Sequence, residues 1–322
     1  MMNRLLPLLI SALVGLSGAG AHAAYPDKPI RLIVPWAPGG STDAIARAVA
    51  QRMSETMGQS VVVDNRSGAS GRIGTEAAAK ALPDGYTFAI VELPHAIAPA
   101  VFAKMPYDLL RDFSSISMVG SSPLVLFVSA SQYKNGDIRA FLKNGKGSDA
   151  PFALAHSGNG SISHLSSELF AGATGLKINP IPYRGSAPAL TDVVAGTVTG
   201  HFATMASGNS LLSAGKLSAL MVTGASRLPG LPEVPTAKEA GIAGMQFNQW
   251  WALVAPATTP IEIIERLRKE AMAALAHPST RDRLTTLGID LKGSSRDELR
   301  AFMRNEVEQW GAVVRKAGIR PE

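Results

Sequence analysis

Three polar, glycine-rich segments stand where the sequence predicts that a strand ends and a helix begins. They read PWAPGGSTD at residues 35–43, HSGNGSISH at 156–164 and PYRGSAP at 182–188. Sheets of α/β proteins bind ligands at such junctions, glycine lets the backbone approach a ligand closely, and the amides at a helix start favour an anion. The segments therefore predict capture of a negatively charged small molecule by hydrogen bonds. Each segment taken alone also fits an ordinary capped turn.

The side chains in these segments suit a carboxylate ligand. Ser157, Asn159 and the free amides of the second segment offer several donors, so no arginine is needed there. Arg184 offers a planar guanidinium for a second carboxylate, and Tyr183 offers a ring to cover an organic ligand together with a hydroxyl donor. His164 fits either ligand contact or packing within the following helix, and the sequence leaves both open.

Glu92 is the residue that fits an anion site least. It follows the predicted strand 86–91 and precedes Leu93 and Pro94. A carboxylate beside a bound anion is unfavourable because like charges repel. The side chain therefore turns away, pairs with Arg184 or a lysine, or meets a donor on the ligand, and these alternatives stay open.

Motifs for catalysis and for metal binding are absent from the sequence. No G-x-S-x-G, H-E-x-x-H, G-x-x-x-x-G-K-[ST] or G-x-G-x-x-G pattern occurs, and the six histidines never take metal-ligand spacing. The chain has no cysteine, which excludes disulfides, thiolate metal sites and cysteine nucleophiles. We expect no catalytic residue, no metal and no cofactor. The enzymatic alternative is a hydrolase that uses Ser157 or Ser161 as nucleophile with His95 or His164 as base.

Residues 1–23 are predicted to be an export signal. An arginine precedes an apolar run at 5–16 that a single serine interrupts, and the triplet AHA at 21–23 matches an A-x-A cleavage site. The run is shorter than the about 20 residues that a membrane-spanning helix needs. We therefore expect cleavage near Ala23 and a mature protein in the bacterial periplasm.

Short β-rich runs alternate with helical patterns along the rest of the chain, which predicts an α/β fold with a parallel sheet. The predicted strands are 30–35, 61–64, 86–91, 124–128, 152–155, 178–182, 200–204, 217–222 and 246–254. The predicted helices are 41–57, 74–82, 161–172, 186–195, 207–214, 260–276, 279–287 and 295–317. The last three have no sheet of their own, so we expect them to cover the first domain. This organisation predicts a discontinuous domain 1 (24–123 plus 247–322), an inserted domain 2 (124–246) and a hinge where the chain crosses twice.

Composition limits the class of protein. Of the 322 residues, 46% are apolar and 17% are charged, so the chain can bury a large core and is not disordered. The net charge of +6 is spread along the sequence, and no basic stripe is long enough to follow a phosphate backbone. We expect no nucleic-acid partner.

The motifs together resemble one protein family. YPDKPIRLIVPWAPGGSTD at 25–43, DNRSGASGRIG at 64–74, PDGY at 83–86, GSISH at 160–164 and YRGSAPA at 183–189 are similar to motifs of the Bug-type, TctC-like receptors. These are the extracytoplasmic solute-binding proteins of tripartite tricarboxylate transporters. The similarity extends over essentially the whole mature chain, in order and at family spacing.

The resemblance implies a two-lobed periplasmic binding protein (Venus-flytrap) fold with one ligand in a cleft between the lobes. The ligand would be a carboxylate-bearing small molecule, held by the loop and helix start of the inserted domain and by water bridges from the first loop. The partners would be this small organic acid and the permease subunits in the membrane, and we expect a monomer. The ligand-binding residues predicted from the motifs and from the resemblance are Trp36, Gly39, Gly40, Ser41, Thr42, Asp43, Glu92, Ser157, Asn159, Gly160, Ser161, His164, Tyr183 and Arg184.

The sequence departs from the family pattern at residues 92–94, where members often carry a small polar run and this chain has Glu-Leu-Pro. We expect ligand identity to be set there. Leu93 and Trp36 favour an apolar or aromatic ligand body, whereas Glu92 favours an amino group. An aliphatic dicarboxylate, an aromatic carboxylate and an amino-acid-like ligand therefore stay open. A ligand sensor for a signalling partner is the alternative to transport.

Overall fold

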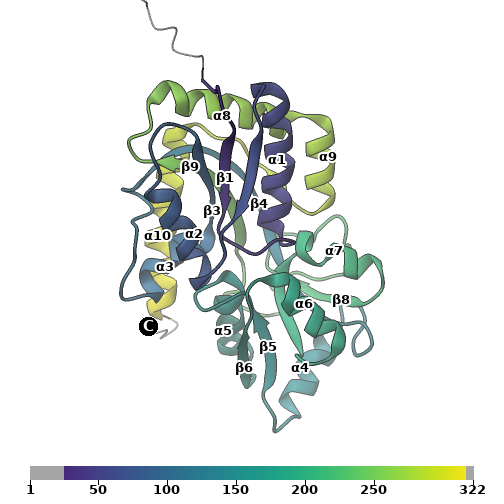
Figure 1. Cartoon of the computed structure of the whole chain (residues 1–322). Helices are drawn as coiled ribbons and strands as arrows, with labels where there is room; N and C mark the ends of the chain where they lie inside the picture. Colours follow the sequence, from purple (N-terminus) through teal and green to yellow (C-terminus); the bar gives the residue numbers. More distant parts are fainter. Residues whose placement is uncertain (1–24, 317–322) are drawn as a thin grey trace, which may run out of the picture.

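The computed structural model describes residues 25–316, which form an α/β fold of two lobes (Figure 1). The strands are β1 Ile30–Val34, β2 Val61–Asn65, β3 Thr87–Glu92, β4 Phe113–Ser129, β5 Phe152–His156, β6 Ile178–Pro182, β7 Gly200–Thr204, β8 Leu217–Val222, β9 Asn248–Pro256 and β10 Asp290–Leu291. The helices are α1 Ser41–Met57, η1 Ala69–Gly71, α2 Arg72–Ala79, α3 Leu93–Val101, α4 Ile138–Lys146, α5 Ile162–Thr174, α6 Ser186–Ala195, α7 Met205–Ser213, α8 Ile261–Ala276, α9 Pro278–Thr286 and α10 Arg296–Lys316. The signal predicted at 1–23 lies outside the described residues. Among the described helices, none is both long enough and apolar enough to span a membrane.

Each lobe contains a parallel set of strands, and long antiparallel strands connect the two sets. The strand order is β2-β1-β3-β9-β4-β7-β5-β6, with β8 and β10 also paired to β4. Strand β1 is parallel to β2 and β3, and β5 is parallel to β6 and β7, whereas β9 is antiparallel to β3 and β4. The predicted parallel sheet is therefore correct within each lobe and wrong at the centre, where the sheet is mixed.

Strand β4 serves both lobes. Its first part, residues 113–123, pairs with β9, and its second part, residues 124–129, pairs with β7 and β8. The sequence predicted a strand only at 124–128, because the Ser-Ser-Pro segment before it suggested a break. Pro123 has no N–H to donate to a neighbouring strand. It stands where the pairing partner changes, and the strand continues through it.

Apolar clusters lie on both faces of the sheet and leave the strand ends open. Helices α1 and α8 cover one face of the first lobe, with Val49 and Leu267 fully buried. Helices α3 and α10 cover the opposite face, and that cluster continues into the second lobe at Phe170. A third cluster around Phe127 packs α6 and α7 onto the strands of the second lobe. Because the helices occupy the faces, the carboxyl ends of the parallel strands remain available for a site.

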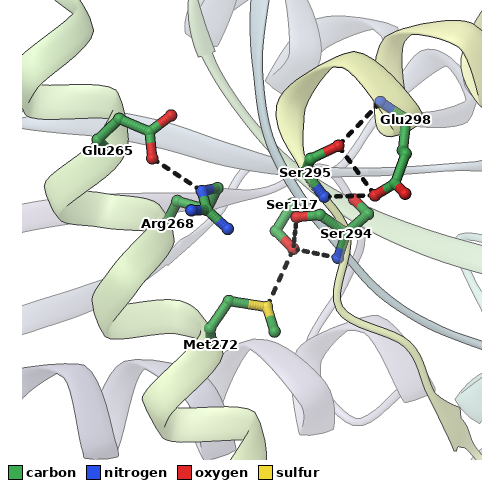
Figure 2. A network of polar contacts seen from close by, with 7 residues as sticks. All are labelled: Ser117, Glu265, Arg268, Met272, Ser294, Ser295 and Glu298. Atoms are coloured by element: carbon green, nitrogen blue, oxygen red, sulfur yellow. Dashed lines mark hydrogen bonds and ion pairs between the residues drawn. The ribbon is translucent and has the colours of Figure 1, made fainter.

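The C-terminal helices return to the first lobe, as predicted. Helix α8 packs on α1 and β4, and α10 packs on α3 and β4. Hydrogen bonds anchor the start of α10 to the sheet (Figure 2). The Ser294 backbone N–H donates to Ser117 Oγ on β4 (3.1 Å). Ser295 and Glu298 then form a capping box, with the Ser295 N–H donating to Glu298 Oε2 (2.8 Å) and the Glu298 N–H donating to Ser295 Oγ (3.2 Å).

The sequence did not predict helices α3 and α4. Helix α3 contains Pro94 and Pro99, and prolines usually argue against a helix. Pro94 lies in the first turn, where an amide proton has no intrahelical partner to lose. Helix α4 is short, with Ile138 and Phe141 buried and Asp137 Oδ1 accepting the Ala140 N–H (3.2 Å) at its start. The other predicted helices agree with the structure to within one turn.

Candidate functional site

Within residues 25–316, five helices begin at one gap between the lobes. They are α1, α3, α5, α6 and α7, and they follow strands β1, β3, β5, β6 and β7 respectively. Residues from the first turn of all five line one cavity of about 70 Å³, called the inner cavity below. The carboxyl ends of the parallel strands of both lobes therefore meet at this cavity, which is where α/β proteins place ligands.

The electrostatic field in the inner cavity favours an anion. The unpaired amides at a helix N-terminus carry about half a positive elementary charge, and five such ends converge here. None of the described residues that line the cavity is a lysine or an arginine, and Glu92 is the one ionisable side chain among them. Gly40 and Gly185 precede α1 and α6 and provide no capping side chain. In α1 the Ser41 N–H donates to Ser207 Oγ (3.3 Å), so the amides without a capping side chain are that of Thr42 and the first amides of α6.

A larger outer cavity of about 550 Å³ lies beside the inner one. It is lined by Trp36, Ser67, Gly68, Ala69, Ser70, Arg72, Phe102, Ser157, Gly158, Asn159, Pro182, Tyr183 and Arg184. Trp36 and Ser157 line both cavities, so the two adjoin. Arg72 and Arg184 bring positive charge to the outer cavity from opposite lobes, and the Arg72 guanidinium lies 3.6 Å from the centroid of the Phe102 ring.

The structure brings ten of the predicted ligand-binding residues to these cavities. Those on the inner cavity are Trp36, Gly40, Ser41, Thr42, Glu92, Ser157 and Ser161. Those on the outer cavity are Trp36, Ser157, Asn159, Tyr183 and Arg184. The predicted residues that line neither cavity are Gly39, Asp43, Gly160 and His164.

Asp43 is directed away from the gap and stabilises the first loop. Its carboxylate pairs with Arg47 (2.9 Å) and accepts hydrogen bonds from Asn65 Nδ2 (3.0 Å) and from the Gly39 N–H (3.1 Å). Burial acts against ionisation, but the hydrogen bonds from Arg47, Gly39 and Asn65 outweigh it and lower the pKa of Asp43. In this structure Gly39 and Asp43 are bonded within the first loop and line neither cavity.

Gly160 and His164 shape the second loop. Gly160 has a φ of +75°, a conformation that favours glycine. Its N–H donates to His164 Nδ1 (3.2 Å), and the His164 ring stacks on His156 with centroids 4.5 Å apart. The alternative in which His164 packs within the protein therefore fits the structure better than ligand contact.

Tyr183 presents its ring and not its hydroxyl donor. The hydroxyl donates to Asp192 Oδ2 (2.6 Å), which uses the proton that was expected to reach a ligand. Burial and the adjacent Asp192 raise the pKa of Tyr183 to about 12. The ring still lines the outer cavity, in line with its predicted covering role.

Glu92 lies in the wall of the inner cavity and is only 4% exposed. Its Oε2 accepts hydrogen bonds from Thr42 Oγ1 (2.6 Å) and from Gln249 Nε2 (2.7 Å), and Trp251 Nε1 donates to the same Thr42 oxygen (3.0 Å). The carboxyl thus neither turns away nor is held by a lysine or by Arg184, which were two of the alternatives. Burial raises its pKa to about 7, although the hydrogen bonds from Thr42 and Gln249 act in the opposite direction.

A chain of hydroxyl groups runs along the second-lobe wall and ends at a histidine. Ser163 Oγ lies 3.3 Å from Ser157 Oγ, which lies 3.1 Å from Ser186 Oγ. Ser186 Oγ lies 3.1 Å from His201 Nε2, and His201 Nδ1 lies 2.8 Å from the Ala155 carbonyl oxygen. A carbonyl only accepts, so Nδ1 carries the proton, Nε2 accepts, and the Ser186 hydroxyl donates to it.

Several residues of the inner cavity and its supporting shell were not predicted from the sequence. They are Ser163, Ser186, His201, Thr204, Ser207 and Gln249. Thr204 ends a predicted strand and Ser207 follows it, at the same kind of junction as the three recognised segments, so the sequence contained a signal for them. No such signal marks Gln249 in the sequence, because this residue lies 157 residues from Glu92 in a strand of mostly apolar residues.

Comparison with known proteins identifies the family. A family model described as tripartite tricarboxylate transporter family receptor matches residues 45–319. The chain belongs to this family. Protein BugT of Bordetella pertussis is 36% identical over 323 residues, covering 99% of both chains. A solved Rhodopseudomonas palustris protein with adipate is 35% identical, with a TM-score of 0.88 and coverage of 92% of this chain and 100% of that one. MatC from the same organism, with bound malate, is 31% identical, with a TM-score of 0.85 and coverage of 90% and 100%.

The family and the fold predicted from the sequence are thereby confirmed. This member of the tripartite tricarboxylate transporter receptors has the two-lobed α/β fold of periplasmic binding proteins. The sheet of this fold is mixed: β4 and β9 run antiparallel at its centre, so it does not consist of parallel strands alone.

Proposed function

We propose that this receptor captures a small dicarboxylate in the periplasm and passes it to the membrane permease of a tripartite tricarboxylate transporter. The observation that carries the proposal is the convergence of five helix N-termini on a cavity without a cationic side chain in its lining. Backbone amides and helix dipoles suffice to hold an anion in such a site. The relatives solved with adipate and with malate support a dicarboxylate.

The two cavities suggest how a dicarboxylate is held. The inner cavity, at about 70 Å³, accepts one carboxylate and few further atoms, since a cavity that binds benzene measures about 150 Å³. The carbon chain and the second carboxylate then occupy the outer cavity, where Arg72 and Arg184 offer guanidinium groups. Bound water bridges the first loop to the ligand and lets ligands of different length fit.

Capture requires the two lobes to close on the ligand. In this proposal domain 1 (24–123 plus 247–322) and domain 2 (124–246) move about the crossings at β4 and β9. The signal is removed near Ala23 on export, and the mature receptor acts as a monomer.

A hydrolase is less favourable at this site. Its nucleophile would be Ser186 or Ser157, because the hydroxyl chain ends on His201. The other imidazole nitrogen of His201 bonds to the Ala155 carbonyl and not to a carboxylate, and burial lowers the pKa of His201 to about 4. A general base works best when its pKa lies near the working pH. His201 is therefore a weak general base at neutral pH, whereas binding without chemistry requires no general base.

Thermal unfolding of the mature chain with candidate ligands tests the proposal. Adipate and malate at 100 times their dissociation constant should stabilise the protein by about 2.7 kcal/mol, seen as a rise in Tm of several degrees. Benzoate and aspartate test the aromatic and amino-acid alternatives, and 1,6-hexanediol is the uncharged control. If no anionic compound raises Tm at pH 6 or at pH 8, the receptor function is wrong. Uptake of the stabilising compound by cells with and without the receptor gene tests delivery to a permease.

Replacement of Gly160 by alanine should weaken ligand binding about tenfold. A Cβ at Gly160 would lie 2.9 Å from Cε2 of Phe102, which belongs to the opposite lobe. Overpacking of this kind costs about 1–3 kcal/mol, and it acts only when the lobes are closed. The matched control is Gly175→Ala at the end of α5, which also has a positive φ (+71°) and where an added Cβ has no neighbour within 4 Å. Calorimetric titration with adipate measures both affinities, and equal affinities for the two variants would contradict the expected contact across the gap.

A further inference from the structure

Glu92 is a carboxyl group in a site built for anions. It is the one ionisable side chain among the described residues that line the inner cavity, and it is nearly inaccessible to solvent. A bound carboxylate would share this small, dry space with it. Two negative charges in such surroundings repel strongly, because little water is left to screen them. Either the ligand brings a positive group to Glu92, or Glu92 becomes neutral when the ligand binds.

The side-chain amide of Gln249 is only half used in this structure. Gln249 is 4% exposed, lines the inner cavity and donates from Nε2 to Glu92 Oε2. Its Oε1 is buried and has no hydrogen-bond partner among the described residues. An unpaired buried acceptor destabilises the state that contains it, because its hydrogen bond to water is lost and not replaced. In this orientation the amide nitrogen serves Glu92 and the atom left without a partner is an acceptor, whereas a carboxylate ligand needs donors.

Protonation of Glu92 removes both the charge repulsion with the ligand and the unpaired acceptor of Gln249. A neutral carboxyl has one O–H donor, which can serve Gln249 Oε1 once the amide turns over. The amide Nε2 is then free to donate to a ligand carboxylate, and the charge repulsion is gone. Thr42 Oγ1 can keep its hydrogen bond to the carboxyl, because a protonated carboxyl still accepts. One proton from solvent is the only atom added.

On the basis of the proposed function, we propose that the receptor binds its dicarboxylate together with one proton, which Glu92 takes up as Gln249 turns its amide nitrogen toward the ligand. The ligand class that follows is a carboxylate without an ammonium group near Glu92. An amino-acid-like ligand would instead pair its ammonium with ionised Glu92 and would bind without a proton.

The titratable groups packed around Glu92 do not compete for this proton near neutral pH. On α3, burial lowers the pKa of His95 to about 4, and the Glu92 backbone N–H donates to its Nδ1 (3.0 Å). On α1, Asp43 is paired with Arg47 and directed away. On the second lobe, His201 lies behind the hydroxyl chain, and burial lowers its pKa to about 4. Strand β9 faces Glu92 with neutral side chains only. The pKa of Glu92 itself, raised by burial to about 7, places its titration where the receptor works.

Calorimetric titration of the mature chain with adipate and with malate tests proton uptake directly. Tris and triethanolamine buffers differ in ionisation enthalpy and contribute no anion that could compete for the site, so the difference in binding heat at pH 8 gives the number of protons taken up. We expect close to one proton per ligand, and a dissociation constant that rises about tenfold per pH unit above pH 7. Both ligand carboxyls are already ionised there, so the proton must go to the protein.

Two variants assign the proton to its site. Glu92→Gln resembles the neutral carboxyl and should bind without proton uptake, with a dissociation constant that is flat in pH. Glu306→Gln is the matched control, because Glu306 is another partly buried carboxyl with a raised pKa, caused by burial and opposed by hydrogen bonds from Trp250 and Trp310. It does not line the inner cavity, so it should keep the uptake and the pH dependence of the natural chain.

The outcomes separate this inference from the receptor function. Dicarboxylate binding with no proton uptake and a flat pH profile in the natural chain overturns the role of Glu92 and leaves the function intact. That measurement needs no variant, so a Glu92→Gln chain that fails to fold does not remove the test. If aspartate binds more tightly than adipate and binds without proton uptake, the proposed role of Glu92 is also overturned. Absence of binding by any carboxylate overturns the function itself.

Discussion

Replacement of Ala187 by aspartate should lower the affinity for a dicarboxylate about a hundredfold. Ala187 is in the first turn of α6, lines the inner cavity and faces Gly39 across the gap. A carboxylate placed there would share the inner cavity with that of the ligand, and two like charges about 5 Å apart repel by about 3 kcal/mol at an effective dielectric constant of about 20. The fold should tolerate the change, because an aspartate near a helix N-terminus stabilises the helix by about 0.3–1 kcal/mol.

Ala187→Asn is the matched control for this prediction. Asparagine has nearly the same shape as aspartate and no charge, so it reports the steric cost alone. Calorimetric titration with adipate at pH 7 gives the two affinities, and thermal unfolding without ligand shows that both variants are folded. Equal losses for aspartate and asparagine would mean that size and not charge decides binding, and the anion site would have to be abandoned.

Glu92 should make the ligand-free receptor less stable as the pH rises from about 4.5 to about 7. The pKa of its carboxyl is raised from 4.5 in the unfolded chain to about 7 in the folded one, chiefly by burial. Between these values the folded state binds more protons than the unfolded state, so unfolding becomes easier with rising pH. The full effect is up to about 3 kcal/mol above pH 7, and it is absent below pH 4.5.

Comparison with Glu92→Gln isolates this effect from other titrations. His95 and His201, whose pKa values burial lowers to about 4, reduce stability at acid pH equally in both chains. The stability difference between variant and natural chain should therefore be constant below about pH 4.5, grow in favour of glutamine up to about pH 7, and then level off. Urea unfolding at pH 4.5, 6 and 8 measures it. A difference that does not change with pH would show that Glu92 titrates at its ordinary pKa.

The sequence by itself determined the family, the fold class and much of the site. Helix α1 was predicted with the bounds that the structure has, because Ile45, Val49 and Met53 repeat at helical spacing and all are buried. The loops at 35–43, 156–164 and 182–188 were recognised because glycine, serine and a following helix form a local pattern. Local patterns survive folding, and ten of the predicted ligand-binding residues line the two cavities.

Only the tertiary structure decided what these loops face, and which partners and which pKa the Glu92 carboxyl has. Strand β9 pairs antiparallel with β3, and this brings Gln249 within 2.7 Å of a carboxylate 157 residues earlier. No local pattern encodes that contact or the burial that raises the pKa of Glu92 to about 7. The same holds for Asp43 and Tyr183, whose polar groups were expected at the ligand and are used by Arg47 and Asp192. Residue type fixes what a side chain can do, but its partners and its dielectric surroundings come from segments far away in the chain.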